Sequence, residues 1–295
     1  MPNLGRLLTA MVTPFTADGA VDYDRARALA QKLVDEGSDG LVVSGTTGES
    51  PTLTKDEKIA LFKAVKEAVG DRATVVAGTG SYSTAETIAL SQAAERAGVD
   101  ALLLISPYYN KPNQAGLLAH FSAVADAVSL PIILYNHPGR TGVTIEPATM
   151  VELAKKPNIV AVKDSSGNLD LATDYRRQLP ADFALYSGDD PLTIAYSAIG
   201  GVGVISVSAH VAGREIKAML DAWDKGDLVE ARRIHLALYE LHKVLFCAPS
   251  PAPAKFALAH RGFAVGGVRL PLLELDAADQ AKVAKVLDSL ALVTA

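Results

Sequence analysis

The chain has 295 residues, of which 49% are hydrophobic, and its formal net charge is −5. This length suffices for one large core, or for a barrel with a small appendage. A mildly acidic balance gives no electrostatic reason to expect a nucleic-acid partner, and it leaves room for a local positive spot that binds a small anion. The longest apolar runs, such as residues 101–105, are far too short to span a bilayer.

The first eight residues lack the long apolar stretch and the cleavage site of a signal peptide. Cys247 is the single cysteine, so no disulfide can form within the chain, and we expect this side chain to be a small buried hydrophobe. The protein is therefore expected to be soluble and cytoplasmic.

Short runs of β-branched or apolar residues recur along the chain. Each is four to eight residues long and nearly continuous in apolar character, which is typical of parallel strands covered on both faces. The eight expected strands are Leu7–Pro14, Gly40–Ser44, Thr74–Ala77, Ala101–Ser106, Pro131–Tyr135, Ile159–Lys163, Ala184–Ser187 and Val202–Ser206.

The stretches between these runs have helical spacing and recognisable ends. Thr54 and Ser83 each precede a glutamate by three residues, which predicts a helix N-cap with a capping box at both positions. Glycines that follow helical patterns directly are typical of helix C-termini. They are Gly37, Gly70 and Gly98.

Eight strand–helix units that end near residue 225 predict an α/β fold of the (β/α)₈ or TIM-barrel class. A doubly wound sheet is the alternative, but it would normally have fewer strands and a phosphate-binding fingerprint after the first one. The Gly78-Thr79-Gly80 sequence lacks a third glycine at the required spacing. Residues 226–295 show helical periodicity and little strand character. We therefore expect a catalytic barrel domain over residues 1–225 and a C-terminal helical domain over residues 226–295.

Barrels of this class carry their active sites at the C-terminal ends of the strands. Lys163 is unusual there, because it ends the apolar run that begins at Ile159. Burial disfavours its ammonium form, and attack on a carbonyl requires a neutral amine. Tyr135 ends the preceding strand and can carry protons. Arg140, five residues further on, can hold a carboxylate in a bidentate fork.

Thr46 and Thr47 follow the second strand and lie between two glycines, so their hydroxyls and backbone N–H groups can together hold a carboxylate. Each of these residues alone has an ordinary explanation. Lys163 would be a structural lysine whose head reaches solvent, Tyr135 a core tyrosine, and the two threonines part of a turn. Their joint presence on one rim favours a catalytic site.

Two other patterns could suggest a metal site, and neither is interpreted as one. Asp189 and Asp190 precede Pro191, which favours a helix N-cap over a cation site. The six histidines are scattered and form no ligand cluster in the sequence. We therefore expect neither a metal nor an organic cofactor.

Two motifs and the strand-six lysine carry a family resemblance. The motifs are residues 45–49 (Gly-Thr-Thr-Gly-Glu) and residues 135–142 (Tyr-Asn-His-Pro-Gly-Arg-Thr-Gly). In their order and spacing they resemble the dihydrodipicolinate synthase and N-acetylneuraminate lyase family of pyruvate-dependent class I aldolases. The resemblance runs from about residue 5 to residue 290. Residues 250–253 (Ser-Pro-Ala-Pro) and the Asp-Ser pair after Lys163 depart from the commoner Asn-Pro-Ile-Pro and Glu-Ala patterns.

The resemblance implies a role for each residue on the rim. Lys163 forms an imine with pyruvate, and Tyr135 shuttles protons through Thr46 to Tyr109. It also implies that Tyr109 reaches into the site of a neighbouring subunit, so a homo-oligomer built as a dimer of dimers is expected. The remaining implied ligands are Thr46 and Thr47 for the pyruvate carboxylate, Arg140 for the carboxylate of the second substrate, and Gly188 and Ile205 through their backbones.

Within the family, Arg140 and the double threonine favour condensation of pyruvate with L-aspartate 4-semialdehyde, in the diaminopimelate route to lysine. The nearest alternative is another pyruvate-dependent aldolase, lyase or dehydratase that acts on a sugar acid or on 4-hydroxy-2-oxoglutarate and would not need Arg140. A non-catalytic barrel that binds a keto acid is a third possibility, and Lys163 beside Tyr135 argues against it.

Many members of this family are inhibited by lysine at a dimer cleft. A cationic Lys58 at that cleft would repel a cationic ligand, so weak or absent feedback by lysine is expected. The positions that match the family's cleft are Ser50, Lys55, Lys58, Tyr82, Glu86 and Tyr108.

Overall fold

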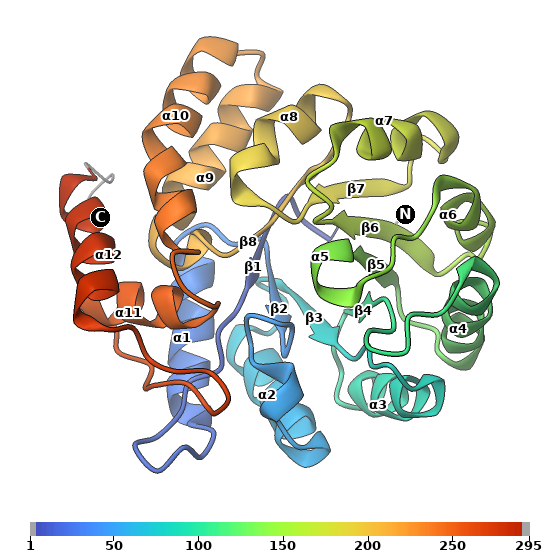
Figure 1. Ribbon diagram of the computed structural model, residues 1–295, viewed down its shortest axis with the longest axis horizontal. Coiled ribbons are helices and arrows are strands. Elements are labelled where there is room, and N and C mark those ends of the chain that lie inside the picture. Colours follow the sequence, from blue (N-terminus) through green and yellow to red (C-terminus); the bar gives the residue numbers. More distant parts are fainter. Residues whose placement is uncertain (1–3, 291–295) are drawn as a thin grey trace.

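The computed structural model describes residues 4–290, which form a closed barrel of eight parallel strands (Figure 1). Each strand pairs with its neighbours in chain order, and β1 pairs with β8 to close the barrel. The predicted barrel is therefore confirmed. The strands are β1 (Leu7–Ala10), β2 (Gly40–Val43), β3 (Thr74–Gly78), β4 (Ala101–Ile105), β5 (Ile132–Asn136), β6 (Ile159–Asp164), β7 (Ala184–Ser187) and β8 (Gly203–Ser206).

The helices surround the barrel as an outer ring, and three further helices extend it on one side (Figure 1). Two short 3₁₀ turns, η1 (Ser50–Thr52) and η2 (Asp190–Leu192), follow β2 and β7. The ring comprises α1 (Tyr23–Asp35), α2 (Lys55–Val69), α3 (Thr84–Arg96), α4 (Gln114–Ala127), α6 (Pro147–Leu153), α7 (Leu169–Gln178), α8 (Thr193–Ala198) and α9 (Ala209–Asp224). The extension comprises α10 (Leu228–Val244), α11 (Ala252–His260) and α12 (Ala277–Ser289). The single turn α5 (Pro138–Thr141) lies inside the ring, next to the end of β5 (Figure 1).

The first strand is shorter than expected. It was predicted to reach Pro14, yet it ends at Ala10. The Met11 N–H still donates to the Val42 carbonyl of β2 at 3.0 Å. After it the backbone leaves the sheet, because the Val12 N–H donates to Nε2 of His210 at 3.1 Å and proline has no N–H to offer. The other seven strands agree with the prediction to within one residue at each end.

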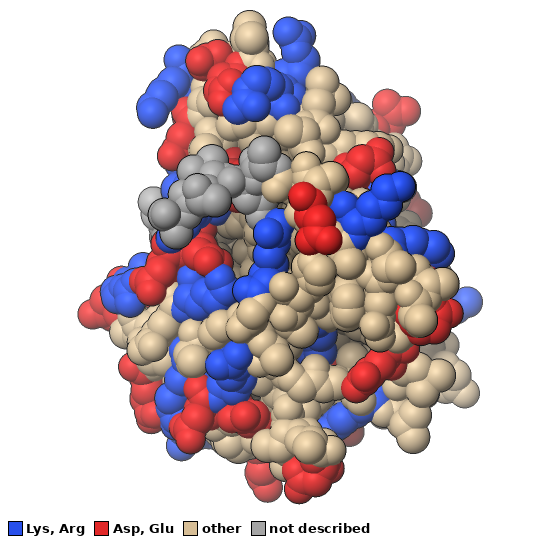
Figure 2. Space-filling view, turned by 90° about the vertical axis from the view of Figure 1, so that its left-hand side faces the viewer, with Lys and Arg blue, Asp and Glu red and all other residues tan. Residues whose placement is uncertain are grey.

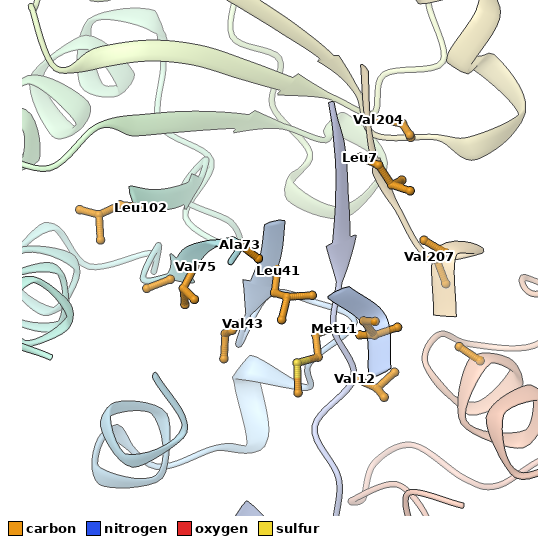
Figure 3. Close-up of a cluster of buried hydrophobic side chains, with 14 of the residues drawn as sticks. Leu7, Met11, Val12, Leu41, Val43, Ala73, Val75, Leu102, Val204 and Val207 are labelled. Carbon is orange, nitrogen blue, oxygen red and sulfur yellow. The ribbon is translucent and has the colours of Figure 1, made fainter. Parts of the chain in front are cut away.

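Alternating strand residues face opposite sides of the barrel wall, as the period of two requires. Outward-facing side chains pack against the helices, and Figure 3 shows several of them, among them Leu7, Leu41, Val75 and Leu102. Inward-facing side chains form a second cluster that fills the barrel. That cluster includes Leu8, Val42, Val76, Leu103, Ile133, Tyr135, Tyr186 and Ile205.

The helix ends form as the local sequence predicts, except for one half of the capping box at Ser83. The Thr54 side chain accepts from the Glu57 N–H and the Glu57 carboxylate accepts from the Thr54 N–H, so this capping box is confirmed. Ser83 is an N-cap as expected, but the second half of its box is wrong, because the Glu86 carboxylate accepts from Ser81 Oγ at 3.0 Å. The expected C-terminal glycines all have positive φ: Gly37, Gly70 and Gly98.

The C-terminal helices α10 and α11 pack against α9, and α12 packs against α10 and α11 (Figure 1). Their buried side chains join the core that surrounds the barrel. The predicted domain boundary at residue 225 falls between α9 and α10 and stays a prediction. The outer ends of the two predicted domains, residues 1–3 and 291–295, lie outside the described residues. On this side of the molecule acidic and basic side chains are interspersed (Figure 2). Cys247, predicted to be buried, is exposed after the end of α10.

No helix between residues 4 and 290 combines the length and the apolar character that crossing a membrane requires.

Candidate active site

Lys163 and Tyr135 lie side by side in the barrel. They are register partners on the adjacent strands β6 and β5, so both side chains point inward at the same level. The Lys163 Nζ atom lies 4.3 Å from the centroid of the Tyr135 ring, and each residue is 6% exposed. Within residues 4–290 neither the amine of Lys163 nor the hydroxyl of Tyr135 has a hydrogen-bond partner, so both are available to a ligand.

A cavity of about 210 Å³ lies at the C-terminal ends of the strands, and its border includes Tyr135 but not Lys163. Tyr135, Thr46 and Arg140 border it, which brings together three of the predicted residues. Arg140 is exposed, and its guanidinium has no ion-pair partner in the described part of the chain. The other bordering residues are Ser44, Gly45, Ser50, Pro51, Gly78, Gly80, Leu103, Ile105, Tyr108 and Thr141.

The loop that carries Thr46 and Thr47 is held by its own backbone. The Glu49 N–H donates to the Thr46 carbonyl at 3.0 Å, and the Ser50 N–H donates to the Gly45 carbonyl at 3.2 Å. Ser44 and Glu49 flank the threonines with φ values of 57° and 56°, a left-handed conformation that residues other than glycine rarely adopt. Thr47 is 7% exposed and lies outside the border of the cavity.

Gly188 lies directly against Lys163. A Cβ atom at position 188 would lie 1.9 Å from Ser165 Oγ and 3.0 Å from Lys163 Cε, so only glycine fits without displacing the lysine. Ile205 is fully buried in the inward-facing cluster that also contains Tyr135. Neither residue is on the border of the cavity.

Asp164 follows Lys163 and anchors the strand end that carries it. Its buried carboxylate accepts hydrogen bonds from Asn136 Nδ2 at 2.8 Å, Ser166 Oγ at 2.8 Å and the Tyr196 hydroxyl at 2.5 Å. Burial and the adjacent carboxylate raise the pKa of Tyr196, which stays protonated as a donor. In the sequence Asp164 stands out only as a departure from the family pattern. Its charge at the end of a buried strand is the feature that could have indicated this anchoring role.

His137 belongs to the site and had been assigned no role. Its ring centroid lies 5.7 Å from that of Tyr135, and its buried Nδ1 atom has no hydrogen-bond partner among residues 4–290. Desolvation, reinforced by the charges of Arg140 and Lys163, lowers the pKa of His137 to about 4. The imidazole is therefore neutral at physiological pH. Its position two residues after Tyr135 was the signal available in the sequence.

The predicted N-cap at Asp189 and Asp190 is wrong in its side-chain contacts. Neither carboxylate caps η2. The Asp190 carboxylate accepts from the N–H groups of Val207 at 2.9 Å and Ser208 at 3.1 Å, so it ties the loop after β7 to the loop after β8. Burial raises the pKa of Asp189 to about 6, and the charge of Lys163 opposes this shift.

Tyr109 does not enter the cavity of its own chain. It is 92% exposed and adopts a left-handed backbone with φ of 70°. Its neighbour Tyr108 borders the cavity and packs edge-on against Tyr82, with ring centroids 5.3 Å apart. Burial raises the pKa of Tyr108 above its usual value.

A second cavity of about 500 Å³ adjoins the first and shares Ser50, Pro51, Gly80 and Tyr108 with it. All six residues predicted for the lysine cleft border it: Ser50, Lys55, Lys58, Tyr82, Glu86 and Tyr108. Desolvation lowers the pKa of Lys58, and Glu86 opposes this shift.

Comparison with known proteins shows the family of this chain. A 4-hydroxy-tetrahydrodipicolinate synthase from Moorella thermoacetica is 58% identical over 283 residues, which cover 96% of this chain and 97% of that protein. The crystal structure of a dihydrodipicolinate synthase from Bacillus anthracis matches with a TM-score of 0.96 and 45% identity, covering 98% of this chain and 99% of that one. The lysine-bound enzyme from Cyanidioschyzon merolae matches with the same four values. Residues 3–290 match the Dihydrodipicolinate synthetase family, to which this chain belongs.

Proposed function

We propose that this chain is a lyase that condenses pyruvate with L-aspartate 4-semialdehyde to give 4-hydroxy-tetrahydrodipicolinate, with Lys163 as the amine that captures pyruvate. The observation that carries the proposal is the Lys163–Tyr135 pair, in which an amine without a hydrogen-bond partner lies 4.3 Å from the centroid of a tyrosine ring that borders the cavity. The high identity to synthases of this name over nearly the whole chain supports the choice of substrates.

The first half of the reaction makes pyruvate a nucleophile. Lys163 Nζ attacks the keto carbon of pyruvate, and loss of one water molecule leaves an imine to the lysine. The imine withdraws electrons from the methyl group, which loses a proton and becomes an enamine. Thr46 and Thr47 bind the pyruvate carboxylate through hydroxyls and backbone N–H groups, and Tyr135 carries the protons.

The second half forms the new carbon–carbon bond. The enamine carbon attacks the aldehyde carbon of the semialdehyde, whose oxygen takes up a proton. The substrate's own amine then attacks the imine carbon, which closes the ring and releases Lys163 as a free amine. Arg140 holds the carboxylate of the semialdehyde in a bidentate fork at the mouth of the cavity. Since the imine serves as the electron sink, this chemistry needs no metal or organic cofactor.

The assembly is part of the same proposal. Tyr109 projects from its own chain with 92% of its surface exposed, and it enters the site of a second copy in a dimer, where it receives protons from Tyr135 through Thr46. Pairing of two such dimers gives the homotetramer. Gly188 and Ile205 contribute backbone groups to substrate binding.

Borohydride trapping tests the central step. Incubation with pyruvate and borohydride is expected to add one pyruvate-derived adduct, which peptide mass spectrometry locates at Lys163. The Lys163→Ala variant loses the adduct, whereas Lys156→Ala, which removes a surface lysine on the approach to β6, keeps it. Absence of an adduct in the wild type would support a non-catalytic barrel. Turnover of the semialdehyde, run against a panel of sugar acids and 4-hydroxy-2-oxoglutarate, tests the second substrate.

A further inference from the structure

A buried ion pair lies behind the threonine loop and away from the cavity. Lys255 Nζ on α11 lies 2.7 Å from Glu49 Oε1, and the exposed fractions of the two side chains are 3% and 0%. The Lys255 amine also donates to the Gly267 carbonyl at 2.5 Å and lies 4.1 Å from the centroid of the Phe15 ring. Burying two charges is costly, so a pair held in this way needs a reason beyond stability.

Arg269 adds a second connection from the same C-terminal region. Its backbone N–H donates to Glu49 Oε2 at 2.9 Å, so both carboxylate oxygens of Glu49 face residues beyond 250. Its guanidinium binds the Glu57 carboxylate at 2.6 and 2.9 Å and the Thr52 carbonyl at 2.8 Å. Lys255 and Arg269 together hold residues 49–57, the segment that follows the two threonines.

The backbone of Glu49 connects these C-terminal contacts to the Thr46–Thr47 loop, where the pyruvate carboxylate is proposed to bind. Its N–H donates to the Thr46 carbonyl at 3.0 Å, and its backbone is left-handed with φ of 56°. A glutamate keeps such a conformation only when its surroundings impose it. The Glu49 side chain is held by Lys255 and Arg269, and these contacts are among the surroundings that restrain it.

We propose that the C-terminal segment sets the position of the Thr46–Thr47 loop through Glu49, so that Glu49, Lys255 and Arg269 are positioning residues for binding of the pyruvate carboxylate. None of the three borders the cavity. This inference rests on the proposed function, because it assumes that the two threonines bind pyruvate. It gives the C-terminal helices a part in substrate affinity in addition to their part in the fold.

The test separates positioning from stability with three variants. Glu49→Gln and Lys255→Met each leave one buried charge without its partner, and both are expected to lower the melting temperature. The double variant Glu49→Gln/Lys255→Met removes both charges at nearly constant volume and is expected to recover most of the melting temperature. Glu230→Gln is the matched control, because it breaks an exposed ion pair with Arg233 on α10.

The readouts are the pyruvate concentration that half-saturates borohydride trapping, KM for both substrates, and kcat. The double variant is expected to need about tenfold more pyruvate than the wild type, since a small misplacement of binding groups is costly. Its KM for the semialdehyde stays within about twofold, whereas kcat also falls, because Thr46 relays protons from Tyr135. The control matches the wild type throughout.

The possible results distinguish this inference from the proposed function. A double variant that is folded and binds pyruvate like the wild type overturns the positioning role and leaves the proposed function intact. A wild type that forms no adduct with pyruvate overturns the proposed function and this inference with it.

Discussion

Lys163 on β6 and Tyr135 on β5 are register partners, with the amine 4.3 Å from the centroid of the ring. Parallel strands in register place both side chains at one level of the barrel, so the two groups need no loop to bring them together. This rigidity suits a proton carrier that must stay beside a covalent intermediate.

Replacing Tyr135 by Phe removes the hydroxyl and keeps the ring packing. We expect kcat to fall by roughly 10²- to 10⁴-fold, the range typical of a lost general acid–base group, and pyruvate trapping to become slower. Stopped-flow and steady-state assays measure both effects. Tyr186→Phe is the control, because that hydroxyl donates to the Gly5 carbonyl at 2.7 Å and has no place in the mechanism. Equal losses in the two variants would contradict a specific role for Tyr135.

Arg140→Ala should separate the two substrates. We expect kcat/KM for the semialdehyde to fall by roughly 100-fold, because a bidentate charged contact is lost, while pyruvate trapping on Lys163 continues. Arg140→Lys should recover little, since an ammonium cannot reproduce the fork. A variant that loses trapping and turnover together would show that Arg140 serves pyruvate or the fold instead.

Gly188→Ala should damage both the fold and the catalytic lysine. The new Cβ would lie 1.9 Å from Ser165 Oγ and 3.0 Å from Lys163 Cε, so we expect a loss of about 1–3 kcal/mol in unfolding free energy and a large fall in kcat. Urea unfolding and steady-state assays measure these. Adding Ser165→Ala removes the shortest contact and should restore stability more than activity. If Gly188→Ala alone retains full kcat, the lysine is not confined by this glycine.

L-Lysine should inhibit this enzyme weakly or not at all, although a relative is known with lysine bound. Lys58 borders the cavity where such a ligand would lie, and two like charges about 5 Å apart repel by roughly 3 kcal/mol at an effective dielectric constant near 20. Lys58→Asn should therefore increase sensitivity to lysine at least about tenfold. Lys63→Asn, on the exposed side of the same helix, should not. Half-maximal inhibition of the wild type by micromolar L-lysine would contradict the expectation.

The free energy of unfolding should decrease as the pH falls from 7 to 5, in part through His210. This fully buried residue accepts the Val12 N–H at Nε2, and burial lowers its pKa from 6.5 to about 4. Between these two values the unfolded chain binds a proton that the folded chain does not, so stability is lost as acid is added. At pH 5 this difference in the pKa of His210 lowers the free energy of unfolding by about 2 kcal/mol.

Urea unfolding at pH 7 and pH 5 measures this loss. His210→Gln, which does not titrate, should lose less stability between the two pH values than the wild type, by about that amount. His260→Gln, which removes a partly exposed imidazole 2.7 Å from Asp288 Oδ1, should lose as much as the wild type. If the His210→Gln and wild-type proteins lose equal stability, His210 is not responsible.

Much of the barrel follows from the sequence, because its signals are local. Continuous apolar runs such as Ala101–Ile105 form strands wherever both faces are covered, and a capping box such as that of Thr54 acts within one turn of helix. The barrel also fixes which strand ends meet. A tyrosine at the end of strand five and a lysine at the end of strand six could therefore be expected to lie together.

Other contacts required the tertiary structure. His137, Asp164 and the Glu49–Lys255 ion pair carry no local pattern that reveals their partners. The carboxylate of Asp190 binds N–H groups in the loop after the next strand, where the sequence suggested a cap within its own helix.

The sequence by itself determined the order of the elements and the residue types on the catalytic rim, because periodicity and composition act over a few residues. Only the tertiary structure decided which charges meet across the barrel and its C-terminal helices. Glu49 and Lys255 are separated by about 200 residues along the chain. Their contact depends on how α11 packs against the loop after β2, and a packing arrangement of that kind leaves no trace in the spacing of either residue.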